Sequence, residues 1–245
     1  MRRRLDQELV ARGQARTRAQ ARDLVLRGEV AVDGIPAGKP GQLVGAEAKI
    51  VVHSGSVHYV SRGALKLVEG LEAFSFDPAG CIALDIGAST GGFTQVLLER
   101  GAAKVYAVDV GRGQLAAEVA ADPRVVALEA TDARALDAGV VPELASALVA
   151  DVSFISLTKA LGPALAIAAP EAWLVALVKP QFEAGRDAVG KGGIVRDPAE
   201  RQAAIDHVAE WIGARPDWRV VGVVESPIPG GDGNQEYLLG AVRHG

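Results

Sequence analysis

Cysteine is almost absent from this sequence, and that absence excludes a fold stapled by disulfide bonds. The single cysteine, Cys81, lies in an apolar run, and the four histidines are scattered along the chain. No Cys/His metal cluster is therefore expected. Disulfide-poor chains are typical of reducing compartments, so the expected location is cytoplasmic.

Long uninterrupted apolar runs are also missing. The longest nearly uncharged stretch, residues 160–178, is divided by Pro163 and Pro170. A membrane-spanning helix needs about 20 apolar residues, so we expect a helix over 155–168 and a buried strand over 172–178 instead. The arginines near the N-terminus are not followed by the apolar segment of a secretory signal. No membrane association is expected.

Positive charge is slightly outnumbered, with 26 Lys and Arg residues against 30 Asp and Glu residues, and its distribution along the chain is uneven. Residues 1–27 hold eight arginines against Asp6, Glu8 and Asp23, and the remainder of the chain is acidic. This asymmetry predicts that the N-terminal part meets a polyanion such as a nucleic acid.

A glycine-rich turn is the most informative motif that is present. Residues 85–93 read Asp-Ile-Gly-Ala-Ser-Thr-Gly-Gly-Phe after an apolar run, and Asp109 ends the next apolar run. Strand, glycine turn, helix and second acid are typical of a nucleotide site in a doubly wound sheet.

The pattern selects among nucleotides. The second glycine of G-x-G-x-x-G is replaced by Ser89, and no phosphate-binding lysine follows, so neither a pyrophosphate nor a triphosphate is expected. S-adenosylmethionine (SAM) fits better, with Asp85 and the turn holding its amino-acid end and Asp109 its ribose. The alternative is a turn that only connects a strand to a helix. The predicted cofactor residues are Asp85, Gly87, Ala88, Ser89, Gly91, Gly92, Phe93, Asp109 and Asp132.

Residues 61–245 alternate between strand and helix patterns. This predicts an α/β domain with a doubly wound, Rossmann-like sheet covered on both faces. The last two strands are separated by a short Gly/Pro-rich loop, so they should form an antiparallel hairpin at the end of a mostly parallel sheet. The predicted strands cover residues 82–85, 104–109, 125–128, 147–151, 173–178, 220–225 and 237–242.

Residues 1–60 predict a separate, small α+β domain. Two short helices, with Thr17 as the cap of the second and Gly28 at its end, precede a hairpin at Asp33-Gly34 and a strand over 49–52. Three arginines lie on or next to the second helix: Arg16, Arg18 and Arg22. This face is expected to lie along phosphates, the alternative being a solvated basic face.

Four charged residues lie near the ends of predicted strands. Asp151 and Lys179 end the fourth and fifth strands, Glu236 precedes the last strand, and Lys66 lies at the start of a helix before the first strand. Asp151 and Lys179 each follow a buried run, where an unpaired charge is costly. Either these residues form structural salt bridges or they are catalytic. Beside a methyl donor they suggest methylation of a hydroxyl, with Lys179 as the base because burial favours a neutral lysine. Residues 151–154 lack the Pro-Pro turn of many enzymes that methylate amines.

Several motifs carry a family resemblance. The order Gly13-x-Ala15-Arg16-Thr17-Arg18, followed by Val30-x-Val32-Asp33-Gly34, resembles the alpha-L RNA-binding motif. The motifs at 61–67, 85–94, 108–115, 151–157, 178–183 and 233–236 resemble the TlyA family, which joins that module to an FtsJ-like ribose methyltransferase.

The resemblance implies a Lys-Asp-Lys-Glu tetrad at the four charged positions and cytidine 2′-O-methylation of ribosomal RNA. It also implies contacts to structured RNA by Arg4, Arg16, Arg18, Arg22 and Arg62. Asp132 is a departure, because the family more often has asparagine there; an aspartate can still meet the adenine amino group. No metal and no obligatory protein partner are implied.

Two rival functions remain open at this point. One is pore formation, since the family is also named for haemolysin activity, and the sequence lacks a long cationic amphipathic segment that would support it. The other is an RNA-binding assembly factor without chemistry. The glycine-rich segment 183–196 is expected to form a mobile loop over the RNA site. The modified nucleotide, the ribosomal subunit and the oligomeric state stay undetermined.

Overall fold

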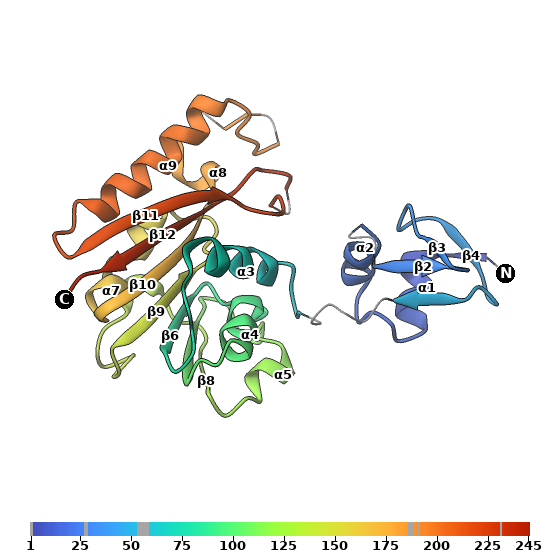
Figure 1. Cartoon of the computed structure of the whole chain (residues 1–245), viewed down its shortest axis with the longest axis horizontal. Coiled ribbons are helices and arrows are strands. Elements are labelled where there is room, and N and C mark those ends of the chain that lie inside the picture. Colours follow the sequence, from blue (N-terminus) through green and yellow to red (C-terminus); the bar gives the residue numbers. More distant parts are fainter. Residues whose placement is uncertain (1, 27–28, 53–58, 186–188, 191, 231) are drawn as a thin grey trace. The chain divides into compact units, whose positions relative to one another are not determined.

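The computed structural model describes residues 2–26, 29–52, 59–185, 189–190, 192–230 and 232–245. The chain separates into two compact units, Met1–His58 and Tyr59–Gly245. The helices and strands of both units are labelled in Figure 1. The expected end of the second helix at Gly28 and part of the expected loop 183–196 lie outside the described residues.

The N-terminal unit packs two helices against short antiparallel strands. Thr17 caps the second helix as expected, because its hydroxyl accepts a hydrogen bond from the Gln20 backbone N–H at 3.2 Å. Strands β2 and β3 form the expected hairpin, and β5 pairs with β2. The elements are β1 (Arg2–Arg4), α1 (Leu5–Ala11), α2 (Arg18–Leu26), β2 (Val30–Val32), β3 (Ile35–Pro36), β4 (Leu43–Gly45) and β5 (Ile50–Val52).

The second unit is built on a seven-stranded sheet in the order β11-β12-β10-β9-β6-β7-β8. The pairs from β10 to β8 are parallel, whereas β12 runs antiparallel to both β10 and β11. The predicted antiparallel end of a mostly parallel sheet is therefore confirmed. The strands are β6 (Ile82–Ile86), β7 (Lys104–Val108), β8 (Val125–Leu128), β9 (Ala145–Ala150), β10 (Ala168–Val178), β11 (Trp218–Glu225) and β12 (Tyr237–Arg243).

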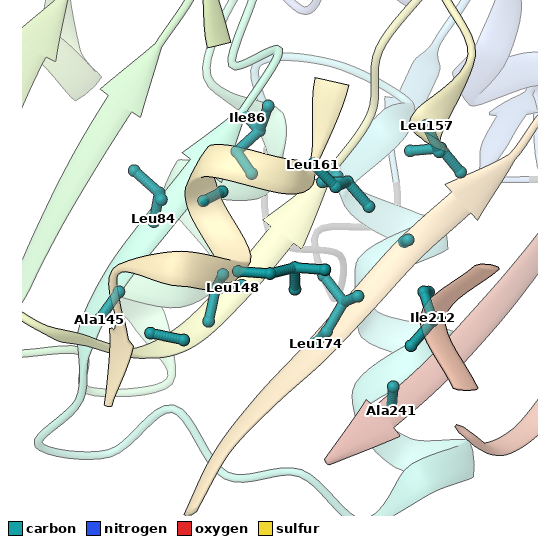
Figure 2. Packing of buried hydrophobic residues seen from close by; sticks show 14 of the residues in the cluster. Leu84, Ile86, Ala145, Leu148, Leu157, Leu161, Leu174, Ile212 and Ala241 are labelled. Atoms are coloured by element: carbon teal, nitrogen blue, oxygen red, sulfur yellow. The ribbon is translucent and has the colours of Figure 1, made fainter. Parts of the chain in front are cut away.

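Alternate residues of the central strands build two separate cores, one on each face of the sheet. In β9, Leu148 belongs to one core and Val149 to the other, as a two-residue side-chain period requires. The first core, which includes Leu157, Leu161 and Leu174, is shown in Figure 2. The helices are α3 (Gly63–Phe74), α4 (Gly92–Glu99), α5 (Ala117–Ala120), η1 (Ala133–Ala135), α6 (Leu157–Ala160), α7 (Gly162–Ala166), α8 (Pro180–Glu183) and α9 (Pro198–Gly213).

The prediction of one continuous helix over 155–168 was wrong. The structure has two short helices there, α6 and α7, and β10 already begins at Ala168. Pro163 does not interrupt a helix but lies in the first turn of α7, where its missing N–H costs nothing. Within the described ranges, no helix combines the length and the apolar character needed to cross a membrane.

Candidate active site

The glycine turn follows β6 at the carboxyl edge of the parallel strands, where α/β sheets bind ligands. Gly87 has a φ of 85°, and a Cβ atom there would lie 2.4 Å from the carbonyl oxygen of Asp151. A Cβ on Gly92 would lie 2.1 Å from the Ser61 Oγ. Glycine is therefore required at position 87, where the turn passes against the backbone at the end of β9, whereas a side chain at position 92 would displace the Ser61 hydroxyl.

Asp109 follows β7 and is fixed beside this turn. Its Oδ2 accepts a hydrogen bond from the Ser89 backbone N–H at 2.8 Å, and its Oδ1 accepts one from the Gly111 N–H at 2.7 Å. A carboxylate has further lone pairs, so both oxygens can still accept from a ligand. The end of β7 and the glycine turn therefore hold the Asp109 carboxylate in one orientation.

A cavity of about 940 Å³ lies in front of the turn, in the size range of small-molecule sites, about 300–1,000 Å³. Gly87, Ser89, Asp109 and Asp132 line it. Asp132 caps η1, and hydrogen bonds from the Arg134 side chain lower the pKa of Asp132 to about 2. Asp132 is therefore an anion throughout the physiological range.

A second cavity, of about 240 Å³, lies on the other side of the turn. Ala88, Gly92 and Phe93 line it, and it shares Gly87, Ser89 and Asp151 with the first cavity. Two of the predicted cofactor residues, Asp85 and Gly91, line neither cavity.

Asp85 is fully buried beneath the turn and is placed differently from the expectation that it faces a ligand. Its Oδ2 accepts a hydrogen bond from the Thr94 hydroxyl at 2.6 Å. Burial raises the pKa of Asp85 to about 7, and the Thr94 hydrogen bond offsets part of that rise. Its contact with α4 through Thr94 means that Asp85 supports the turn from below.

The four predicted tetrad residues come together as two ion pairs. Lys66, on α3, lies 2.5 Å from the Glu236 carboxylate, just before β12. Lys179, at the end of β10, lies 2.5 Å from the Asp151 carboxylate, at the end of β9. The two lysines are 8% and 9% exposed and Glu236 is 2% exposed, so these pairs are largely desolvated.

One member of each pair lines a cavity, whereas their partners, Lys179 and Glu236, line neither cavity. Lys66 and Arg62 line the smaller cavity, and Asp151 lines both. The predicted RNA-binding residue Arg62 therefore lies beside the tetrad. Within the described parts of the chain, no group of His, Cys, Asp and Glu side chains is arranged to hold a metal ion.

Sequence reasoning missed Ser153 and Phe154. The Lys179 ammonium donates a hydrogen bond to the Ser153 Oγ at 2.9 Å. Phe154 is 91% exposed, has a φ of 65° and contacts the ring of Phe182 at 5.2 Å between centroids. Their segment did give a signal: residues 151–154 lack a Pro-Pro turn, which argued against an amine substrate, and residues 151–157 carried part of the family resemblance. Neither argument gave Ser153 or Phe154 a role.

The predicted RNA-binding arginines of the N-terminal unit are exposed: Arg4, Arg16, Arg18 and Arg22. Arg4 and Arg18 share one partner, because both donate to the carboxylate of Asp6, at 3.0 Å and 3.3 Å. Asp6 is fully buried, and the hydrogen bonds from Arg4 lower its pKa. This organising role of Asp6 was not predicted. It holds two of the arginines in place while leaving much of each guanidinium in solvent.

Comparison with known proteins gives the family. The FtsJ-like methyltransferase model matches residues 59–243, and the S4 domain model matches residues 3–50. The chain is 50% identical over 240 residues to the 16S/23S rRNA (cytidine-2′-O)-methyltransferase TlyA of Mycobacterium tuberculosis strain H37Rv, covering 96% of this chain and 88% of that protein.

Two further relatives carry another name. Hemolysin A of Brachyspira hyodysenteriae is 40% identical over 238 residues, covering 96% of this chain and 98% of that protein. The solved structure of a Streptococcus thermophilus protein named as a hemolysin superposes with a TM-score of 0.75 at 38% identity, covering 99% of this chain and 89% of that chain. The chain therefore belongs to the TlyA family of FtsJ-like methyltransferases.

Proposed function

We propose that this chain transfers a methyl group from SAM to the 2′-hydroxyl of a cytidine in ribosomal RNA. The observation that carries the proposal is the position of the two buried lysine–carboxylate pairs, beside a cofactor-sized cavity and a smaller one. The family and the names of its TlyA relatives support the same reaction. Such a substrate implies activity in the cytoplasm, where ribosomes are made.

The residues around the larger cavity fit SAM. Asp109 offers two fixed acceptor oxygens to a pair of ribose hydroxyls, and the anionic Asp132 offers an acceptor to the amino group of adenine. The glycine turn leaves the backbone open beside Asp109, so a ligand can approach it closely. When bound, SAM supplies an electrophilic methyl group on a sulfonium.

Lys179 is the proposed base. A hydroxyl must lose its proton as it is methylated, and a positioned base contributes about 10²- to 10⁴-fold to such a step. The 2.5 Å contact with Asp151 gives the Lys179 ammonium a route for its own proton, which leaves an amine lone pair to accept the proton of the hydroxyl.

Lys66 and Glu236 form the other half of the site. Their pair is as short as the first and is more deeply buried. The Lys66 ammonium faces the smaller cavity together with Arg62, so that cavity attracts an anionic group such as the phosphate next to the reacting ribose. Lys66 thereby orients the ribose, and Glu236 orients Lys66.

The N-terminal unit is proposed to bring the RNA. The S4 domain match and the exposed arginines support binding to structured ribosomal RNA through phosphates and shape. This mode positions the substrate without reading bases, so the choice of cytidine is assigned to the methyltransferase unit.

The direct test is nucleoside analysis. Ribosomal RNA is incubated with the protein and SAM, digested to nucleosides and examined by mass spectrometry, with RNA incubated without protein as the control. We expect 2′-O-methylcytidine to appear only with the protein and SAM. A methyl group on a base would contradict ribose methylation, and RNA binding without any transfer would favour an assembly factor without chemistry.

A further inference from the structure

Two segments meet at the proposed base. One follows β9 and contains Asp151 and Ser153; the other follows β10 and begins with Lys179. Lys179 contacts both residues of the first segment, at 2.5 Å and 2.9 Å. The position of the Lys179 amine therefore depends on where the post-β9 segment lies.

Glu183, at the end of α8, makes a second connection between the same two segments. Its Oε1 accepts a hydrogen bond from the Leu157 backbone N–H at 2.7 Å, and its Oε2 accepts one from the Ser156 hydroxyl at 2.5 Å. The carboxylate is partly buried, and burial raises its pKa. Glu183 comes four residues after Lys179, so about one helical turn separates the two connections.

The two acceptor contacts fix the beginning of α6. Ser156 is the N-cap of α6 and accepts a hydrogen bond from the Thr158 N–H at 3.2 Å. Glu183 satisfies a further N–H of the same helix start, that of Leu157, which would otherwise lack an intrahelical partner. The post-β9 segment is thus held at its start by Lys179 and at its end by Glu183.

The residues between these two points form a wall of the larger cavity: Val152, Ser153, Phe154, Ile155 and Ser156. Phe154 lies in this segment in a left-handed conformation that costs a non-glycine residue energy, so the surrounding contacts must maintain it. The Phe182 ring, next to Glu183, touches the Phe154 ring. Helix α8 therefore supports the wall through two consecutive residues.

We propose that Glu183 is a positioning residue for methyl transfer, which holds the post-β9 segment against α8 so that Asp151 and Ser153 keep the Lys179 amine in its working orientation. The inference rests on the proposed function of Lys179. Positional errors of about 1 Å can cost on the order of 100-fold in rate. The cofactor contacts are assigned to Asp109, which follows β7, and to Asp132, which caps η1, both outside the post-β9 segment, so SAM affinity depends much less on Glu183.

The test compares Glu183→Ala with a matched control, Asp197→Ala. Asp197 caps α9 by accepting a hydrogen bond from the Ala199 N–H at 2.9 Å, and it lines neither cavity. Each variant removes a carboxylate that accepts a hydrogen bond from the first turn of a helix, and melting curves of both show whether a loss of kcat follows a loss of stability. We expect Glu183→Ala to lower kcat at saturating SAM and RNA about tenfold or more, with the Kd for SAM changed less than about threefold, whereas Asp197→Ala keeps its kcat.

Glu183→Gln supplies the conservative rescue. Its amide oxygen can accept from Leu157, and its amide nitrogen can donate to the Ser156 Oγ, which then donates to the Thr158 hydroxyl 2.7 Å away. Most of the kcat should return. A Gln variant as slow as the Ala variant, or an Ala variant as active as Asp197→Ala, would overturn the proposal.

Amide hydrogen exchange separates a failure of this proposal from a failure of the proposed function. Exchange over residues 152–158 should rise in Glu183→Ala and stay unchanged in Asp197→Ala, whatever reaction the protein catalyses. Unchanged exchange in Glu183→Ala would overturn the positioning role. A wild-type protein that transfers no methyl group would instead refute the proposed function and leave the exchange result to decide whether Glu183 orders the segment.

Discussion

The two units of this chain place positive charge in opposite ways. In the N-terminal unit, exposed arginines surround one buried acid, Asp6, and keep much of their charge in solvent. In the second unit, Lys66 and Lys179 are each buried against a carboxylate of their own. Exposed arginines suit the phosphates of a polyanion, whereas burying an ion pair costs desolvation energy that a merely structural contact seldom recovers. The difference predicts binding in one unit and chemistry in the other.

Removing Lys179 should produce the largest effect. Lys179→Ala is expected to lower the single-turnover rate of methyl transfer about 100-fold or more, with SAM and RNA affinity nearly unchanged. Lys179→Arg should not restore the rate, because a guanidinium stays charged near neutral pH. The rate is measured beside a melting curve. A stable, fully active Lys179→Ala variant would refute the role as base, and a loss that tracks the unfolded fraction would make the Lys179–Asp151 pair structural.

Removing Asp109, on the cofactor side of the second unit, should have the second largest effect. Asp109→Ala should weaken SAM binding by about 1–3 kcal/mol, since it removes charge-assisted hydrogen bonds to the ligand. Calorimetry measures the affinity, and Asp206→Ala on α9 serves as a control that removes an exposed aspartate outside both cavities. Equal affinity of the Asp109 variant and the wild type would show that SAM does not use this carboxylate.

The exposed arginines of α2 test whether the N-terminal unit binds RNA. Arg18→Ala with Arg22→Ala should weaken RNA binding and lower the slope of log K against log salt by about 0.7–0.9 for each lost phosphate contact. SAM affinity should stay the same. The control is Arg100→Ala with Arg219→Ala, which removes two exposed arginines from the second unit. If both double variants keep the wild-type slope, the basic face of α2 is only solvated.

The smallest effect concerns two fully buried aspartates with opposite pKa shifts. Arg4 lowers the pKa of Asp6, so the stability that Asp6 contributes is lost as the pH falls. Burial raises the pKa of Asp85 to about 7 from 3.8. The protonated form is therefore favoured in the folded state, and the Asp85 contribution to the free energy of unfolding is lost as the pH rises from about 4 through 7.

The variant Asp85→Asn tests the direction of this pH dependence. Asparagine stays neutral and can still accept from the Thr94 hydroxyl, so the variant should melt several degrees above the wild type at pH 8 and close to it at pH 5. Melting curves at the two pH values provide the measurement. An identical pH dependence in variant and wild type would contradict a raised pKa at Asp85.

Much of the second unit could be predicted because its signals are local. Buried parallel strands are apolar runs, and the run that becomes β6 passes directly into a glycine turn. The positions of Asp109, Asp151 and Lys179 followed from the rule that ligands meet the carboxyl ends of such strands. The four charged positions, and Lys179 as the base, were predicted from the residues, and the family resemblance implied in addition that they form a tetrad and that the substrate is a cytidine in ribosomal RNA.

Other features have no local signal. The cost of burying an unpaired charge predicted that Asp151 pairs with Lys179, and the structure has that pair. No signal in the sequence indicated the other pair, because Lys66 and Glu236 are 170 positions apart. Strand β1 is made of three arginines, and only its pairing with β4 makes it a strand. Nothing local indicated that Asp6 is completely buried, which its hydrogen bonds with Arg4 and Arg18 allow. Such placements come from tertiary contacts, which override local propensity.

The division of roles between the two units is tested most directly by measuring both functions in the same two variants. The single-turnover methylation rate at saturating RNA and the RNA dissociation constant are determined for Lys179→Ala and for the Arg18→Ala, Arg22→Ala double variant. The account predicts that the first variant loses rate and keeps RNA affinity, whereas the second loses RNA affinity and keeps its rate. Loss of the same quantity in both variants would contradict it.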